Sequence, residues 1–187
     1  ALGHARQAAV GLQHAHDRNL VHRDIKPANL LLSEGGTVKI LDLGLALLTA
    51  EDEESLTIMH NERVMGTADY LSPEQAVNSH EVDQRTDIYS LGCTLYFLLT
   101  GQPPFPNGTL AQRIAMHQTK EPEAIVNIRQ NCPAPIVQFC KRMMQKKPED
   151  RFPEATIVIS EIDSYLKDGE FPETGALRGK FDFDLPG

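Results

Sequence analysis

The chain has 187 residues, enough for one globular domain or a large part of one, and its 41% of hydrophobic residues excludes an intrinsically disordered chain. Its net charge of −8 argues against a general nucleic-acid-binding surface, which needs clustered Lys and Arg. The three cysteines form no C-x-x-C pair, so we expect reduced thiols and a cytoplasmic protein. The most apolar stretch, residues 88–99, is too short to span a bilayer.

The first element that the sequence predicts is a helix at the very start of the chain. Residues suited to a buried face recur every three or four positions, at Leu2, Ala5, Ala9, Leu12 and His16. This spacing is typical of one face of an α-helix. Asn19 follows as a left-handed terminator. Since no capping residue precedes the helix, we interpret its position as a sign of truncation.

Two short strands are predicted next. Residues 30–32 and 37–41 are rich in strand-forming side chains, and the Ser-Glu-Gly-Gly run of residues 33–36 suits a turn between them. A hairpin brings its two ends together. We therefore expect Asn29, which precedes it, and Asp42, which follows it, to be neighbours in space.

The rest of the chain is predicted to be mainly helical. Residues 45–65 are polar and irregular and suggest a long loop, of a length that is usually functional or mobile. Residues 87–100 predict a helix that is apolar on nearly every side, and is therefore buried all round, which Gly101 ends. Three more helices are predicted at residues 110–118, 135–146 and 153–167. The expected fold class is α+β, mainly α, with one short β-hairpin.

Three groups of residues indicate phosphoryl transfer. The run from His22 to Asn29 reads HRDIKPAN, residues 42–44 read DLG, and residues 66–74 read GTADYLSPE. In such a reaction a protein aligns a hydroxyl with the phosphate and neutralises charge. Any one of the polar residues in these groups could be an ordinary turn or capping residue. Their combination at this spacing makes the prediction specific.

The side chains in these groups match the chemistry. Asp24 is suited to accept the proton of the attacking hydroxyl. Asn29 and Asp42 supply hard oxygen ligands for Mg²⁺, which bridges the phosphates of a nucleotide. Lys26 provides a point charge for the transferred phosphoryl group.

The order and spacing of the motifs resemble the catalytic loop, metal-binding turn and activation segment of protein kinases. The sequence is similar to the bacterial members of the eukaryotic-like serine/threonine protein kinases. The resemblance covers residues 1–168 and implies the larger, helical C-terminal lobe of the catalytic domain, with residues 169–187 as a strap or linker. It also implies ATP and Mg²⁺ as cofactors, and it gives Asp24, Lys26, Asn29 and Asp42 the roles stated above.

The resemblance implies further roles around the activation segment. Arg23 resembles the arginine that pairs with a phosphorylated activation loop, because a guanidinium binds a phosphate dianion through two hydrogen bonds. Ser55 and Thr57 are the candidate phosphorylation sites. Lys26 and Thr67 favour serine and threonine over tyrosine as the residues that are phosphorylated.

Three residues are expected to hold this machinery in place. Glu74 resembles the glutamate that closes the activation segment, and Arg151 its buried ion-pair partner. Asp87 resembles the aspartate that holds the backbone of the catalytic loop, although a simple helix cap would look the same from sequence. Two positions depart from the family pattern. Leu43 replaces phenylalanine, and Ser72 replaces alanine with little expected consequence.

Half of the kinase machinery has no residues to build it in this chain. No Lys or Glu precedes Asp24, and no G-x-G-x-x-G occurs. We expect that this chain alone is inactive, since the nucleotide-clamping N-terminal lobe is missing. The uncovered apolar face should promote self-association.

The function expected from the sequence is ATP-dependent phosphorylation of Ser and Thr hydroxyls in protein substrates, with no nucleic-acid partner. A full-length protein could be tethered to a membrane by a segment that this chain does not contain. A non-catalytic kinase-like scaffold is the main alternative, which the intact metal-ligand set opposes. A small-molecule phosphotransferase of related fold is opposed by the activation segment that ends at Pro73 and Glu74.

Overall fold

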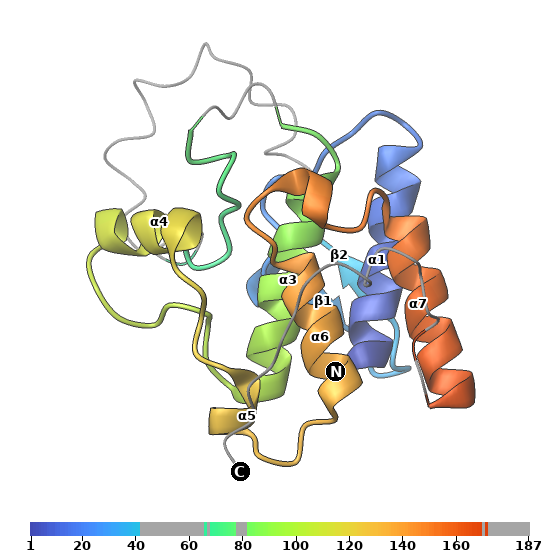
Figure 1. The fold of residues 1–187 in the computed structure, drawn as a ribbon. Helices are drawn as coiled ribbons and strands as arrows, with labels where there is room; N and C mark the ends of the chain where they lie inside the picture. Colours follow the sequence, from blue (N-terminus) through green and yellow to red (C-terminus); the bar gives the residue numbers. More distant parts are fainter. Residues whose placement is uncertain (42–65, 67, 78–81, 170, 172–187) are drawn as a thin grey trace.

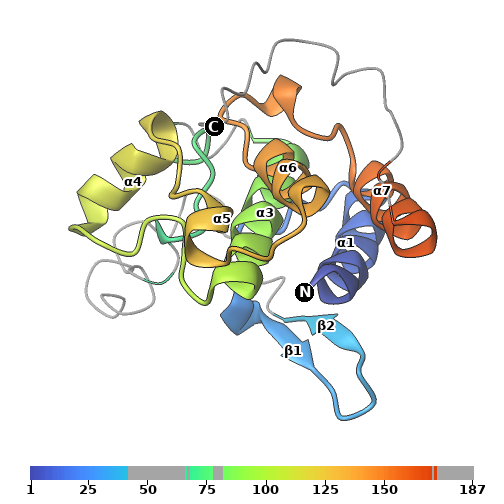
Figure 2. The same ribbon diagram turned by 60° about the horizontal axis from the view of Figure 1, so that its bottom comes forward.

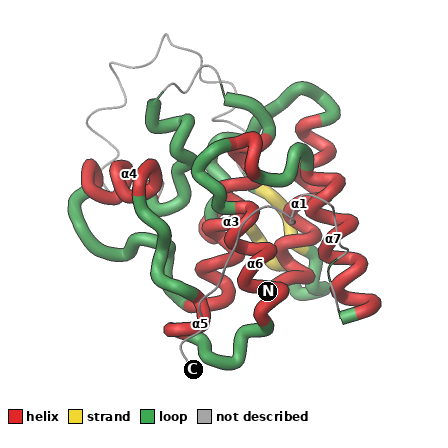
Figure 3. Tube along the Cα trace, viewed as in Figure 1, coloured by secondary structure: helices red, strands yellow, loops and turns green. Residues whose placement is uncertain are grey.

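The computed structural model describes residues 1–41, 66, 68–77, 82–169 and 171 of the chain. Its α-helices are α1 (Leu2–His16), α3 (Arg85–Thr100), α4 (Leu110–Thr119), α5 (Ile125–Ile128), α6 (Ala134–Met143) and α7 (Ala155–Asp168). The other described elements are two 3₁₀ turns, η1 (Pro27–Asn29) and η3 (Pro148–Asp150), and two strands, β1 (Leu30–Leu32) and β2 (Val38–Ile40). The predicted fold class is confirmed, because the described residues are mainly helical with one short hairpin (Figure 3).

Helix α3 lies at the centre of the core and packs against α1, α5 and α6 (Figure 1). Its side chains are apolar on most sides, so that Ile88, Tyr89 and Leu95 are completely buried. Gly101 ends the helix in the left-handed conformation, with φ of 80°, as predicted. The expectation of burial all round was wrong on one side, since Leu98 is 36% exposed.

Helix α1 packs between α3 and α7 and also contacts β2. Its inward face carries small side chains, and Ala5, Ala8 and Ala9 are almost completely buried. Small residues allow two helices to approach closely, so this face fits against two neighbours at once. The chain leaves the helix through Asn19, whose φ of 58° confirms the predicted left-handed terminator.

The hairpin is antiparallel, with Leu30 opposite Ile40 and Leu32 opposite Val38. It extends from the helices at one edge of the fold (Figure 2). The side chain of Gln7 on α1 binds the hairpin through two hydrogen bonds, because its amide donates to the carbonyl of Gly36 and accepts from the N–H of Val38. The turn and the second strand of the hairpin are therefore held beside α1.

The C-terminal helices follow the predicted order with shifted ends. Helix α4 begins with a capping box in which Thr109 and Gln112 each satisfy a backbone N–H of the other. Helix α6 ends at Met143, before the predicted residue 146, and the four-residue helix α5 was not predicted. After α7, the ring of Phe171 stacks on Phe139 of α6 and on Tyr165 of α7.

Two further findings concern the cysteines and the lengths of the helices. All three cysteines are free and buried. Burial raises the pKa of Cys93 to about 12, so that this thiol stays protonated at neutral pH. Within the described ranges, no helix combines the length and the apolar character needed to cross a membrane.

Candidate active site

The loop between α1 and β1 brings three predicted side chains together. Asp24 and Asn29 are 7% and 8% exposed. The Asn29 amide donates to the Asp24 carboxylate Oδ2 at 2.8 Å and to the Asp24 carbonyl at 2.7 Å. Lys26 Nζ lies 2.8 Å from the same Oδ2. Two donors on one oxygen hold the carboxylate in a single orientation.

The backbone of this loop is held by Asp87, the third residue of α3. The Asp87 carboxylate accepts from the N–H groups of His22 and Arg23, at 2.8 Å each, and is completely buried. Arg23 has φ of 67°, the left-handed region that non-glycine residues rarely adopt. A third donor, Nε2 of His16 on α1, reaches the same carboxylate at 2.8 Å. Asp87 therefore acts on the loop backbone, and its side chain caps no helix.

His22 connects the loop to the end of the hairpin. Its Nδ1 accepts from the N–H of Asp24 at 3.3 Å, so the ring carries its proton on Nε2. That Nε2 donates to the carbonyl of Leu41 at 3.0 Å, and the N–H of Leu41 donates to the carbonyl of Asn29. Leu41, the last described residue before Asp42, is thus fixed to the loop through both its N–H and its carbonyl.

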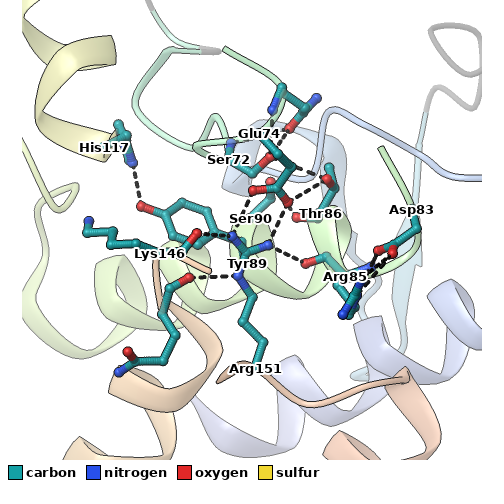
Figure 4. A network of polar contacts seen from close by, with 12 residues as sticks. Ser72, Glu74, Asp83, Arg85, Thr86, Tyr89, Ser90, His117, Lys146 and Arg151 are labelled. Atoms are coloured by element: carbon teal, nitrogen blue, oxygen red, sulfur yellow. Dashed lines mark hydrogen bonds and ion pairs between the residues drawn. The ribbon is translucent and has the colours of Figure 1, made fainter. Parts of the chain in front are cut away.

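Glu74 and Arg151 form an ion pair with two hydrogen bonds (Figure 4). Arg151 Nη1 and Nη2 donate to the two carboxylate oxygens at 2.6 and 2.7 Å, and Thr86 Oγ1 donates to one of them at 2.7 Å. Burial by itself raises the pKa of Glu74. The hydrogen bonds and positive charge of Arg151 outweigh it and lower the pKa overall. Glu74 is therefore ionised at neutral pH.

Arg151 is satisfied by the backbone as well as by Glu74. Its guanidinium donates to the carbonyls of Arg85, Gln145 and Lys146 at 2.7 to 3.0 Å and lies over the ring of Tyr89. Five hydrogen bonds use every donor of the side chain. This ion pair joins the end of the predicted activation segment to α3 and to η3.

Ser72, where the family pattern has alanine, makes hydrogen bonds through its hydroxyl. It is completely buried, and its hydroxyl donates to the side-chain oxygen of Gln75 at 3.0 Å and lies 3.3 Å from Thr86 Oγ1. An alanine could make neither contact. The hydroxyl is part of a polar network with Glu74 (Figure 4), and the expectation of little consequence stays a prediction.

Several predicted residues lie outside the described part of the chain. These are Asp42, Leu43, Ser55, Thr57 and Thr67, together with the acidic loop of residues 45–65. The pairing of Asn29 with Asp42 around one metal ion stays a prediction.

Three polar residues at or near the site were missed by sequence reasoning. His16 was placed on the inward face of α1 without a partner for its ring. Arg113 of α4 pairs with Asp69 of the predicted activation segment at 2.6 Å. Gln75 directly follows Glu74 and donates to the carbonyl of Arg23. Only the inward position of His16, a polar residue on an apolar face, gave a signal in the sequence.

Asn29 fits the role of a magnesium ligand. Its Nδ2 is turned toward Asp24, so the oxygen of the amide is the atom left to meet a cation. Amide and carboxylate oxygens are the ligands that Mg²⁺ prefers. The chemistry of the donor set therefore fits the ion that the sequence predicted.

The loop, the Asp87 support and the Glu74–Arg151 pair together form the arrangement expected of a protein kinase. The family model described as "Protein kinase domain" matches residues 3–161 of this chain. The chain therefore belongs to the protein kinase domain family.

Its curated relatives are bacterial serine/threonine-protein kinases. The chain is 40% identical over 164 residues to a probable serine/threonine-protein kinase of Clostridium perfringens, with 87% of this chain and 23% of the relative covered. It is also 40% identical over 162 residues to the probable serine/threonine-protein kinase PknB of Bifidobacterium longum, covering 84% and 22%. Against the serine/threonine-protein kinase PknB of Mycobacterium tuberculosis it is 36% identical over 166 residues, covering 89% and 26%. The chain spans about a quarter of the length of these relatives.

Proposed function

We propose that the protein containing this chain transfers the γ-phosphate of ATP to Ser and Thr hydroxyls of other proteins. The observation that carries the proposal is the contact of Lys26 and Asn29 with one oxygen of Asp24. The printed names of the relatives, all serine/threonine-protein kinases, support the choice of substrate class.

In this proposal Asp24 orients the substrate hydroxyl and takes its proton late in the transfer. Lys26 neutralises charge on the phosphoryl group as it passes. Asn29 and Asp42 would hold Mg²⁺, which supplies charge neutralisation at the phosphates. Asp87 and His22 act indirectly, because they fix the backbone of the loop that carries Asp24.

We also propose that Arg23 binds a phosphate on the activation loop, at Ser55 or Thr57. The Nε atom of Arg23 is buried and finds no hydrogen-bond partner among the residues that the structure describes. A buried guanidinium N–H is costly to leave unsatisfied, so a phosphate oxygen would suit it. Loss of phosphate-dependent activation in Arg23→Gln would support this role.

The experiment that tests the main proposal measures phosphate transfer by the complete protein. The protein is mixed with Mg²⁺, ATP and a library of Ser- and Thr-containing peptides. We expect transfer that Asp24→Asn lowers by about 10³-fold or more. Asp150→Asn, which changes an exposed aspartate, should leave the rate unchanged. Nucleotide binding without transfer by the wild type would refute the proposal and favour the scaffold alternative.

We infer that the 187-residue chain by itself does not transfer phosphate and needs a further domain to cover its hairpin. Leu31 and Leu32 of β1 are 50% and 51% exposed, and Leu41 is 39% exposed. Exposed apolar side chains of this kind favour association. Light scattering should show the isolated chain self-associating, and less so after Leu31→Ser with Leu32→Ser. Transfer activity of the isolated chain would overturn this inference.

A further inference from the structure

We propose that Gln75 is a positioning residue for Asp24, because its side chain holds the peptide group that precedes the predicted base. The proposal deepens the proposed function and rests on it for its kinetic part. Gln75 lies in the turn just after Glu74, 52 positions from Arg23 in sequence.

The contacts of the Gln75 amide define its orientation. Nε2 donates to the carbonyl of Arg23 at 2.8 Å, and Oε1 accepts from the N–H and the hydroxyl of Ser72 at 3.2 and 3.0 Å. If the amide were rotated by 180°, its oxygen would face a carbonyl and its NH₂ would face an N–H donor. Only one orientation of the amide is therefore satisfied.

The bond to Arg23 completes the support of a strained backbone. The N–H of Arg23 donates to Asp87 and its carbonyl accepts from Gln75, so both polar groups of this residue have partners. Arg23 has φ of 67°, in the left-handed region that L-residues rarely adopt. Such a conformation persists only where surrounding contacts impose it.

The same peptide group determines where Asp24 lies. The carbonyl side of the Arg23–Asp24 peptide is held by Gln75, and its N–H side donates to His22 Nδ1 at 3.3 Å. Without Gln75 the ψ angle of Arg23 is less restrained, and a change in this angle moves the Cα of Asp24. A displacement of about 1 Å at a reacting group can cost about 10²-fold in rate.

Gln75 also connects this peptide to the activation segment. Ser72, which it contacts through Oε1, is in turn next to Thr86, the residue that donates to Glu74. A change in the activation segment near Ser72 would therefore alter the backbone next to Asp24 through the side-chain amide of Gln75. The side chain of Glu74 contacts Arg151 and Thr86.

The first test needs no catalytic activity. In the complete protein, we expect Gln75→Met to increase amide hydrogen exchange in the segment of residues 22–24. Gln13→Met is the matched control, because the Gln13 amide also joins two segments, donating to Asp17 and accepting from the N–H of Thr156. It should leave exchange in residues 22–24 unchanged. Unchanged exchange in Gln75→Met would overturn the proposal.

The second test separates positioning from general stability. We expect Gln75→Met to lower kcat by about tenfold with little change in KM for ATP, and Gln13→Met to change neither. Gln75→Glu keeps the acceptor for Ser72 but places a carboxylate against the Arg23 carbonyl. Protonation restores a donor there, so the kcat of Gln75→Glu relative to wild type should rise as the pH falls. A ratio independent of pH would contradict the positioning role.

The two tests distinguish the possible failures. Increased exchange in Gln75→Met without any kinase activity in the wild type would refute the proposed function and leave the support of the loop by Gln75 standing. An active wild type with unaltered kcat in Gln75→Met would refute the positioning role and leave the proposed function standing.

Discussion

Asp87 Oδ1 accepts a hydrogen bond from the backbone N–H of Arg23 at 2.8 Å, although 64 positions separate the two residues in sequence. The other oxygen of the same carboxylate accepts from His22 and from His16. A carboxylate that receives several hydrogen bonds forms stronger bonds than a neutral acceptor. This contact stabilises the left-handed conformation of Arg23, directly before Asp24.

We predict that Asp87→Asn disrupts the loop while most of the fold survives. An amide at this position cannot accept three hydrogen bonds with both of its heteroatoms, so at least one buried N–H is left unsatisfied. We expect a loss of about 2–4 kcal/mol in the free energy of unfolding and a fall in phosphate transfer of 10²-fold or more. Urea unfolding and peptide phosphorylation measure the two effects.

The control for this prediction is Asp83→Asn, near the start of the same helix. Asp83 pairs with Arg85 at the surface, and such pairs contribute about 1 kcal/mol or less. Its replacement should leave the phosphorylation rate within about twofold of wild type. Equal losses in the two variants would show that the helix, and not the loop, determines the effect.

The Glu74–Arg151 pair should contribute stability that depends on pH. Glu74→Gln leaves the buried guanidinium of Arg151 without its counter-charge, which costs about 3 kcal/mol at neutral pH. The pKa of Glu74 is lowered in the folded state. The contribution is therefore complete above the ordinary value of 4.5 and is lost as the pH falls through the lowered value. Urea unfolding from about pH 7 to about pH 3 should show wild type and variant converging in acid. A constant difference would contradict the linkage.

The buried His117 should produce a second pH dependence of the stability, at higher pH than that of Glu74. Burial and the nearby cation of Lys146 lower the pKa of His117 to about 3, and the backbone of Asp69 opposes them weakly. In the unfolded chain His117 therefore binds a proton near pH 6.5, whereas in the folded chain it stays neutral until the pH is near 3. Stability should fall by a few kcal/mol as the pH falls from about 6.5 toward 3. His117→Gln should flatten this part of the profile, whereas His4→Gln, at an exposed position, should not.

The parts of the fold that depend on local sequence could be predicted. The spacing of apolar residues in α1 and the left-handed end at Gly101 are properties of a few neighbouring residues, and both were found. The four residues of α5 were missed, because one helical turn is too short to show a period. The end of α6 at Met143 was missed for a different reason. Residues that suit a helix continue beyond it, and tertiary contacts decide where it stops.

The candidate site was predicted as far as its residue types allowed. Asp24, Lys26 and Asn29 lie within one loop, so their proximity follows from sequence separation alone. The support of this loop comes from α1, α3 and the turn at Gln75, which are brought together only by the packed core. Sequence could therefore name Asp87 as either a helix cap or a loop support, but could not choose between them.

Gly92 of α3 should tolerate no side chain, because α6 crosses it closely. A Cβ at this position would lie 2.7 Å from Cβ of Met143 and 2.9 Å from Cγ of Met144. The helices would have to separate, and we expect Gly92→Ala to cost about 1–3 kcal/mol in the free energy of unfolding. Gly3 of α1 is the matched control, since nothing lies within 4 Å of its Cβ position. There, alanine should stabilise the helix by about 0.5–1 kcal/mol. Urea unfolding should show that the free energy of unfolding falls in Gly92→Ala and rises in Gly3→Ala. A stabilised Gly92→Ala would contradict the close packing of α3 on α6.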